Sequence, residues 1–316
     1  MMRKSRFSVD DIPKLDGKNI IITGANVGLG FVTALECARK GAHITLACRS
    51  QGRAESAMCD IKTQFPDAKL EFLALDLQDM KQTKEAAEKW LSKGLPLHVL
   101  VNNAGIMAPP FSKTKDGIES QFGTNHIGHF VFTLTLLPRI IESQPSRIVN
   151  LASVGHNFTP TRYFANGFIP LDVINDETKL GIWERYGISK LSNILFTLEL
   201  NRKLKDHKVY CNSCHPGFVA TELMRGPVAS YGSLMGTMNK IYEAFFTVKP
   251  EIGARTQIYL ATSGEVERKS IRGLYLVPTA KIRPPSKLGQ RKELAAELWD
   301  MSMNIVSGTG IQLPSI

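Results

Sequence analysis

The sequence predicts an α/β fold with a mostly parallel, doubly wound sheet of about seven strands and helices on both faces. Short apolar runs alternate five or six times with segments of helical spacing. The runs are continuously apolar, as expected for strands that are buried on both faces. A glycine-rich turn follows the first run directly, at 23–30.

The apolar runs place the strands in chain order. We expect strands at 19–23, 43–48, 70–75, 98–102, 147–151, 208–213 and 273–277. Between them, 29–41 and 80–94 have the spacing of helices, and 290–306 is typical of a last amphipathic helix.

The chain carries no internal repeat and no low-complexity linker, so we expect residues 1–316 to form a single domain. Two segments interrupt the alternation, 155–182 and 225–250, and both contain several glycine or proline residues. Loop-rich insertions of this length are usually functional.

The composition is that of a soluble globular protein, with 43% hydrophobic and 22% charged residues. The sequence has no stretch of about 18 consecutive apolar residues, so it predicts no transmembrane helix. The start, "MMRKSRFSVDDIPKL", has no apolar run typical of a secretory signal. We therefore expect a cytoplasmic protein without an integral membrane segment, and peripheral membrane association stays open.

The net charge of +10 is spread along the chain, which favours a solvated basic surface. Because no known nucleic-acid-binding module is present, we expect no nucleic-acid partner. The five cysteines are scattered and odd in number, which argues against a disulfide scaffold. Cys211 and Cys214 form the C-x-x-C-H pattern of haem attachment, but strand alternation predicts that they face opposite sides of a sheet.

The turn "TGANVGLG" places Gly24, Gly28 and Gly30 between the first strand and the next helix. Glycines allow a tight turn and a close approach to phosphate, and the following helix N-terminus favours the pyrophosphate charge. This pattern in this position predicts a dinucleotide site.

The residue at the end of the second strand indicates which dinucleotide the site prefers. It ends in "LACRS", with Arg49 at its tip and no carboxylate nearby. A guanidinium pairs with a 2′-phosphate, whereas a carboxylate there would bind the 2′-hydroxyl of NAD. The sequence therefore favours NADP(H) over NAD(H), although a solvated arginine would give the same pattern.

These motifs, in this order, resemble the short-chain dehydrogenase/reductase family, which has a Rossmann fold, over residues 16–280. The glycine turn matches T-G-x-x-x-G-x-G, and "NNAG" at 102–105 follows the fourth strand. "NHIGHF", "YGISKLSNILFTLEL" and "CHPGFVATEL" are similar to the branch that contains retinol dehydrogenases and the WW-domain oxidoreductase.

The resemblance implies a role for each matching residue. Tyr186 is expected to be the general acid/base, Lys190 to assist it and bind the ribose, Ser153 to hydrogen-bond the substrate oxygen, and Asn125 to hold a water in the proton path. The expected cofactor contacts are Gly24, Asn26, Gly28, Leu29, Gly30, Arg49, Asp76, Leu77, Asn102, Tyr186, Lys190, Pro216, Gly217 and Thr221. Asp76 could equally be a turn cap.

The spacing of Tyr186 and Lys190 has a chemical reading. Four positions is about one helical turn, so phenol and ammonium would share a face. A phenol has a pKa near 10, and a nearby ammonium plus oxidised nicotinamide would lower the pKa by about two to three units. His126 and His129 lack an evident third metal ligand, so we expect no metal and expect both to pack around Asn125.

Two functions stay open. One is an enzyme that interconverts a carbonyl and an alcohol on a small molecule, with an apolar substrate suggested by the covering segment at about 217–250. The other is a dinucleotide-binding regulatory or scaffolding protein on the same fold. The apolar faces of 129–141 and 190–200 resemble the helices of family dimers, so a homodimer is one interpretation and ordinary sheet cover is the other.

Overall fold

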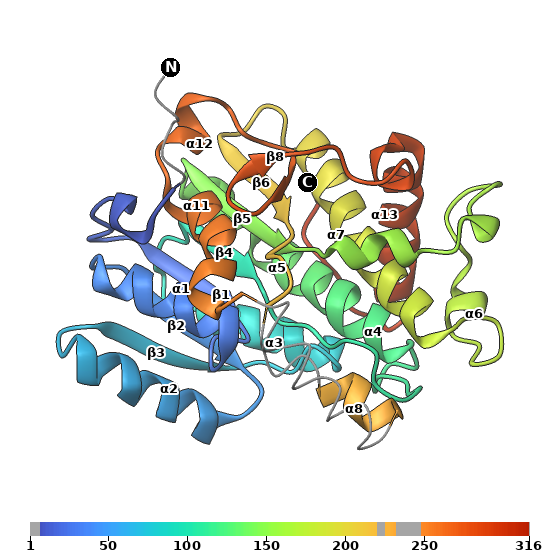
Figure 1. Cartoon of the computed structure of the whole chain (residues 1–316), viewed down its shortest axis with the longest axis horizontal. Helices are drawn as coiled ribbons and strands as arrows, with labels where there is room; N and C mark the ends of the chain where they lie inside the picture. Colours follow the sequence, from blue (N-terminus) through green and yellow to red (C-terminus); the bar gives the residue numbers. More distant parts are fainter. Residues whose placement is uncertain (1–6, 220–224, 232–247, 316) are drawn as a thin grey trace.

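A computed structural model describes residues 7–219, 225–231 and 248–315. One eight-stranded sheet runs through the molecule in the order β3-β2-β1-β4-β5-β6-β7-β8 (Figure 1). The strands are β1 (Asn19–Thr23), β2 (His43–Cys48), β3 (Lys69–Ala74), β4 (Val99–Asn102), β5 (Ser146–Leu151), β6 (Val209–Cys214), β7 (Tyr275–Val277) and β8 (Lys281–Ile282). All pairs are parallel except β7 with β8, which is antiparallel.

The predicted doubly wound fold is confirmed, and a short eighth strand is added. β1 and β2 have the predicted bounds, because continuous apolar runs end where buried strands end. β8 is only two exposed residues long, which leaves no apolar run for the sequence to reveal.

Helices cover both faces of the sheet (Figure 1). They are α1 (Gly28–Arg39), α2 (Gln51–Gln64), α3 (Met80–Leu91), α4 (Ser120–Phe122), α5 (Gly128–Glu142), α6 (Leu171–Ile174), α7 (Ile182–Lys203), α8 (Arg225–Tyr231), α10 (Pro250–Gly253), α11 (Arg255–Thr262), α12 (Glu265–Arg268) and α13 (Lys292–Ser307). The 3₁₀-helices are η1 (Val9–Asp11), η3 (Val154–Phe158), η4 (Thr161–Tyr163) and η6 (Leu288–Gln290), and η2 (Gly123–Ile127) is a π-helix.

Two apolar cores lie on opposite faces of the sheet. One joins the sheet to α3, α5, α7 and α13, and the other joins it to α1, α2 and α11. Cys211 belongs to the first core and Cys214 to the second, so the C-x-x-C-H pair faces opposite sides as predicted. Both thiols are buried, and burial raises the pKa of each to about 12.

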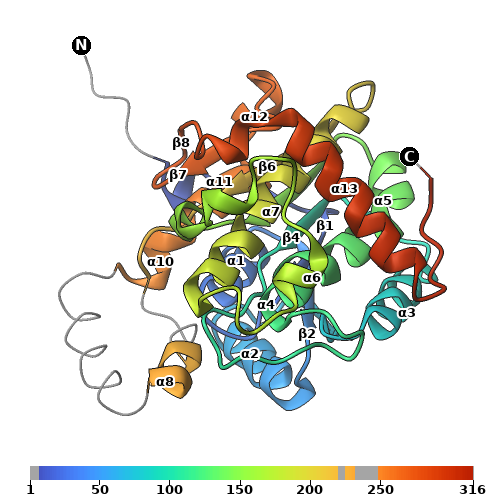
Figure 2. The same cartoon turned by 90° about the vertical axis from the view of Figure 1, so that its right-hand side faces the viewer.

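Helix α13 forms an outer layer over α7 (Figure 2). Trp299 lies against Phe130 of α5 and Phe196 of α7, with ring centroids 5.1 and 6.0 Å away. These are the helices on which the dimer interpretation rested. Many of their apolar residues are buried within a single chain by α13, α3 and the sheet, so these helices serve as sheet cover, and the homodimer stays a prediction.

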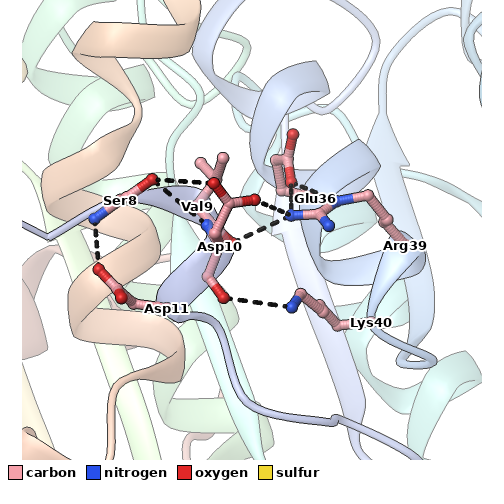
Figure 3. Close-up of polar contacts among 7 residues, drawn as sticks. All are labelled: Ser8, Val9, Asp10, Asp11, Glu36, Arg39 and Lys40. Atoms are coloured by element: carbon pink, nitrogen blue, oxygen red, sulfur yellow. Dashed lines mark hydrogen bonds and ion pairs between the residues drawn. The ribbon is translucent and has the colours of Figure 1, made fainter.

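The N-terminal segment packs over the opposite core. Ile12 and Leu15 are buried there, and Phe7 meets Tyr259 of α11 edge to face. Between them η1 is held by polar contacts (Figure 3). Arg39 donates to the carbonyl oxygen of Val9 at 3.0 Å.

Candidate active site

The turn between β1 and α1 forms one end of a cavity. Gly24 and Gly28 have φ values of +65° and +57°, which residues with a side chain rarely adopt. Gly30 lies beneath the turn, where a Cβ would come within 2.4 Å of the carbonyl oxygen of Gly24. Val27, the N-cap of α1, makes no side-chain cap, so the first N–H groups of this helix suit an anion such as a pyrophosphate.

Two arginines stand at the same end. Arg49 follows β2 and Arg53 lies in the first turn of α2, and both line the cavity. The side-chain oxygen of Asn26, in the glycine turn, accepts hydrogen bonds from Nη2 and Nε of Arg53 at 2.8 and 3.1 Å. Arg53 is thereby fixed to the segment that would carry the phosphates.

The cavity has a volume of about 820 Å³ and continues from these arginines to Ser153, Tyr186 and Lys190. The strand order places it at the carboxyl ends of β1 and β4, the point where the winding of the sheet reverses direction. The chain's residues therefore fit an elongated dinucleotide, with an anion-binding turn at one end and titratable side chains at the other.

Tyr186 and Lys190 lie on α7 and are both nearly buried, at 4% and 5% exposure. The ammonium Nζ of Lys190 is 5.8 Å from the centroid of the Tyr186 ring and donates to the carbonyl oxygen of Leu151 at 3.2 Å. Ser153 follows β5, and its hydroxyl accepts from the N–H of Gly155 at 3.0 Å. A Cβ on Gly155 would approach Tyr186 to 2.6 Å, so this glycine makes room for the ring.

The chain's own residues do not lower the pKa of Tyr186, and the lowering expected with oxidised nicotinamide bound stays a prediction. Burial raises the pKa of Tyr186 to about 12, and the hydrogen bond with Ser153 offsets this only in part. Burial also lowers the pKa of Lys190 to about 8. Desolvation therefore outweighs the attraction between phenolate and ammonium, because both charged forms lose water in the same pocket.

Asn125 lies in the π-helix η2 and is fully buried. Its side chain holds the loop after β4: Oδ1 accepts from the N–H of Ile106 at 2.8 Å, and Nδ2 donates to the Ile106 carbonyl at 2.9 Å. Nδ2 also donates to Ser189 at 3.0 Å, which ties it to α7. π-turns within α-helices are frequent at functional sites.

The other predicted residues divide into three groups. Asn26, Leu29, Pro216 and Gly217 line the cavity. Asp76, Leu77 and Asn102 do not line it. Asp76 caps its turn by accepting from the N–H of Gln78. Asn102 donates to Thr133 of α5 and to Asn150 of β5. Thr221 and most of the predicted covering segment lie outside the described residues.

Several cavity residues were not foreseen. Asn103, Ala104 and Gly105 line it where Asn102 was expected, because they follow the end of β4, whereas Asn102 is still in the strand and its side chain bonds to Thr133 and Asn150. Arg53 was missed because nothing in its local sequence shows which face of α2 it occupies.

Aromatic and aliphatic side chains surround the end of the cavity that holds Tyr186. Trp183 meets Tyr186 edge to face at 6.4 Å between centroids, and Phe158 meets Trp183 at 6.1 Å. Met107, Phe218 and Val219 complete this wall.

Within 7–219, 225–231 and 248–315 no three His, Cys, Asp or Glu side chains gather as a metal site would require. None of the helices in these ranges has the length and apolar character needed to cross a bilayer.

The chain is similar in sequence to known proteins. Residues 18–164 match the sequence model of the short chain dehydrogenase family. The chain is 38% identical to human retinol dehydrogenase 13, over 96% of this chain and 87% of that protein. It is 37% identical to the chicken WW domain-containing oxidoreductase, over 92% of this chain and 69% of the relative.

A solved structure has the same fold. An uncharacterized protein from Mycobacterium paratuberculosis superposes with a TM-score of 0.74 at 31% identity, covering 98% of this chain and all of the other. The chain therefore belongs to the short-chain dehydrogenase/reductase family and is an NAD(P)-dependent oxidoreductase that acts on CH–OH groups.

Proposed function

We propose that the protein uses NADP(H) to interconvert a carbonyl and an alcohol on a small apolar molecule, with Tyr186 as the general acid/base. The observation that carries this is the convergence of Ser153, Tyr186 and Lys190 on a cavity whose other end holds two arginines. When bound, the cofactor supplies or accepts the hydride.

The pKa values suit the reductive direction. A phenol with a pKa near 12 is protonated at neutral pH and can give its proton to the oxygen of a carbonyl as charge develops there. Ser153 is placed to donate a second hydrogen bond to the same oxygen. Lys190 would hold the ribose and stabilise the phenolate that remains.

Arg49 and Arg53 support the preference for NADP(H). Two guanidiniums would bind a 2′-phosphate dianion with charge-assisted hydrogen bonds, and neither gains such a partner from a 2′-hydroxyl. The wall formed by Trp183, Phe158 and Met107 supports an apolar substrate. We also propose a cytoplasmic location.

Tyr186→Phe tests the reaction. This change removes the proton donor and keeps the ring, so turnover with NADPH and a panel of apolar aldehydes and ketones should fall by about 10²- to 10⁴-fold. The affinity for NADPH, measured by fluorescence, should stay within about threefold, since the ring packing is kept. Full turnover in this variant would refute the assignment.

Arg49→Asp and Arg53→Gln test the cofactor preference. Each removes a phosphate partner worth about 1.5–3 kcal/mol, so kcat/KM with NADPH should fall by about 10- to 100-fold. The value with NADH should fall much less, and for Arg49→Asp it should rise. An unchanged NADPH/NADH ratio in both variants would show that the arginines do not select the cofactor.

A further inference from the structure

Three histidines on elements next to the candidate site are almost fully buried, and their hydrogen bonds fix where each carries its proton. His129 lies on α5, His156 in η3 and His126 in the π-helix η2, and each is exposed by 3% or less. In a neutral imidazole one nitrogen donates and the other accepts, so the partners reveal the tautomer.

His129 bridges the candidate catalytic asparagine and β1. Its Nδ1 is 3.0 Å from the main-chain oxygen of Asn125, and its Nε2 is 2.9 Å from the hydroxyl of Thr23. A main-chain oxygen can only accept, so the ring proton lies on Nδ1, directed at Asn125. Nε2 then accepts from the Thr23 hydroxyl, whose other acceptor, the carbonyl of Val101, is farther away at 3.5 Å. That hydroxyl accepts in turn from the N–H groups of Asn103 and Ala104, both at 2.9 Å.

His156 has the same arrangement on the other side of the site. Its Nε2 accepts from the main-chain N–H of Ser286 at 2.9 Å, and a main-chain N–H can only donate. The ring proton therefore lies on Nδ1, which is 2.6 Å from the main-chain oxygen of Ser153. Ser286 belongs to the segment between β8 and η6, 130 residues away in the chain.

His126 has the opposite tautomer and another direction. The hydroxyl of Ser302, on α13, donates to the carbonyl of Leu298 at 2.7 Å, so Nε2 of His126 must donate to Ser302 at 2.8 Å. Its Nδ1 has no partner among the described residues. His126 therefore links η2 to α13 and makes no hydrogen bond to a residue of the candidate site.

We propose that His129 and His156 are positioning residues, each of which holds the main-chain carbonyl of a catalytic residue by its Nδ1–H and is itself anchored through Nε2 to a distant element. The inference rests on the roles proposed for Asn125 and Ser153. Each ring ties the backbone of one of these residues to a distant element. The Asn125 side chain is thereby kept on the loop at Ile106, and the Ser153 hydroxyl is kept at the cavity.

The chemistry fits a positioning role and excludes proton transfer by these rings. Burial lowers the pKa of His129 to about 4, with repulsion from the Lys190 ammonium as a smaller cause. Burial also lowers the pKa of His156, against a partly compensating hydrogen bond to Ser153. Both rings are neutral at pH 7, so each can donate and accept at once.

The test compares the three histidines in the full-length enzyme. In His129→Leu and His156→Leu, kcat for carbonyl reduction with NADPH should fall by about 10- to 100-fold, the loss that a displacement of about 1 Å produces. KM for NADPH should change by less than about threefold. The matched control His126→Leu should lose as much thermal stability, with kcat within about threefold of wild type.

Conservative variants cover the case in which a leucine variant does not fold. The amide of His129→Asn can still donate to the Asn125 carbonyl but cannot reach Thr23, and Thr23→Ser keeps the hydroxyl that Thr23→Val removes. His129→Asn and Thr23→Ser should retain more kcat than His129→Leu and Thr23→Val. The proposal is wrong if kcat does not follow this order, or if His126→Leu loses as much kcat as the other two leucine variants.

A readout independent of turnover separates this proposal from the proposed function. Nitrogen-15 NMR of histidine-labelled protein, with each ring assigned by its own substitution, should show the Nδ1–H tautomer for His129 and His156 and the Nε2–H tautomer for His126. The opposite tautomers for His129 and His156 would overturn the inference whatever the activity. Loss of turnover in Tyr186→Phe with wild-type kcat in the His129 and His156 variants would refute the inference alone. Full turnover in Tyr186→Phe would instead refute the proposed function.

Discussion

The two ends of the described chain lie over opposite faces of the sheet, and they are held by different forces. Helix α13 buries Leu294, Leu298 and Trp299 against α5 and α7. The short helix η1 buries no residue and is held by hydrogen bonds and ion pairs, with 4.0 Å between Arg39 Nη2 and an Asp10 carboxylate that is 86% exposed (Figure 3). Helix α13 is therefore part of a core, whereas η1 itself is a polar turn at the surface between residues that pack on the other core, Phe7 on one side and Ile12 on the other.

The difference predicts unequal contributions to stability. Burying one large apolar side chain stabilises a fold by about 1.5–3 kcal/mol, and the cavity left on its removal adds to the loss. An exposed ion pair contributes about 0–1 kcal/mol, because water screens it and two flexible side chains must be ordered. Substitutions at the two ends can test this contrast.

Trp299→Ala should have the largest effect. We expect it to lower the free energy of unfolding by about 3–5 kcal/mol, since the ring packs between Phe130, Phe196 and the ammonium of Lys203. Urea denaturation measures the loss, and Trp299→Phe, which keeps a ring, should lose less than half as much.

Sedimentation of Trp299→Ala tests whether α13 covers the apolar faces of α5 and α7, because it measures self-association. If α13 detaches, these apolar faces are exposed and the variant should self-associate at concentrations where wild type does not. A loss of stability below about 1 kcal/mol, with unchanged sedimentation, would contradict the idea that α13 is part of the core.

His126→Gln should have the next largest effect, and only in acid. Burial lowers the pKa of His126 to about 3 in the folded chain, whereas the unfolded value is near 6.5. Above pH 6.5 the ring is neutral in both states. Below it only the unfolded state gains a proton, so the free energy of unfolding falls by about 1.4 kcal/mol per pH unit.

Glutamine can still donate to Ser302 but does not titrate. Between pH 6.5 and 4.5 the variant should therefore lose about 2–3 kcal/mol less stability than wild type. His129 and His215, whose pKa values burial also lowers to about 4, remain in both proteins and cancel in the comparison. Parallel pH curves would show that His126 is not kept neutral by the fold.

Arg39→Ala should have the smallest effect. It removes the contacts of one guanidinium with Asp10, Glu36 and the carbonyl of Val9, and should cost less than about 1 kcal/mol. Glu36→Gln, which removes one charge of the same cluster, is the control and should cost less still. A loss of stability as large as that of Trp299→Ala would show that the polar contacts of η1 stabilise the fold as much as the apolar contacts of α13.

The sequence predicted the elements better than their contacts. β1 and β2 were placed to the residue because their apolar runs are bounded by polar turns. Ser153, Tyr186 and Lys190 were expected at one site because their motifs resemble those of the short-chain dehydrogenase/reductase family. The position of α13 over α7 was not predicted, because an amphipathic helix does not specify its partner.

Features that depend on long-range partners were beyond the sequence. The tautomers of His129 and His156 depend on Thr23 and Ser286, which lie 106 and 130 residues away. Burial raises the pKa of Tyr186 in the chain by itself, an effect that the sequence could not reveal, since spacing shows the nearby ammonium but not how much water the fold removes from the phenol.

The π-helix η2 has a consequence for engineering. Its five residues make one wide turn, closed by the hydrogen bond from Gly128 to the carbonyl of Gly123, where an α-helical turn would span one residue fewer. Deleting a residue from this turn would therefore let α4 and α5 join as one regular helix. The helix would be more regular, but Asn125 would be rotated by about 100° relative to its present neighbours. A redesign of this segment should therefore keep its number of residues, even where it changes their identity.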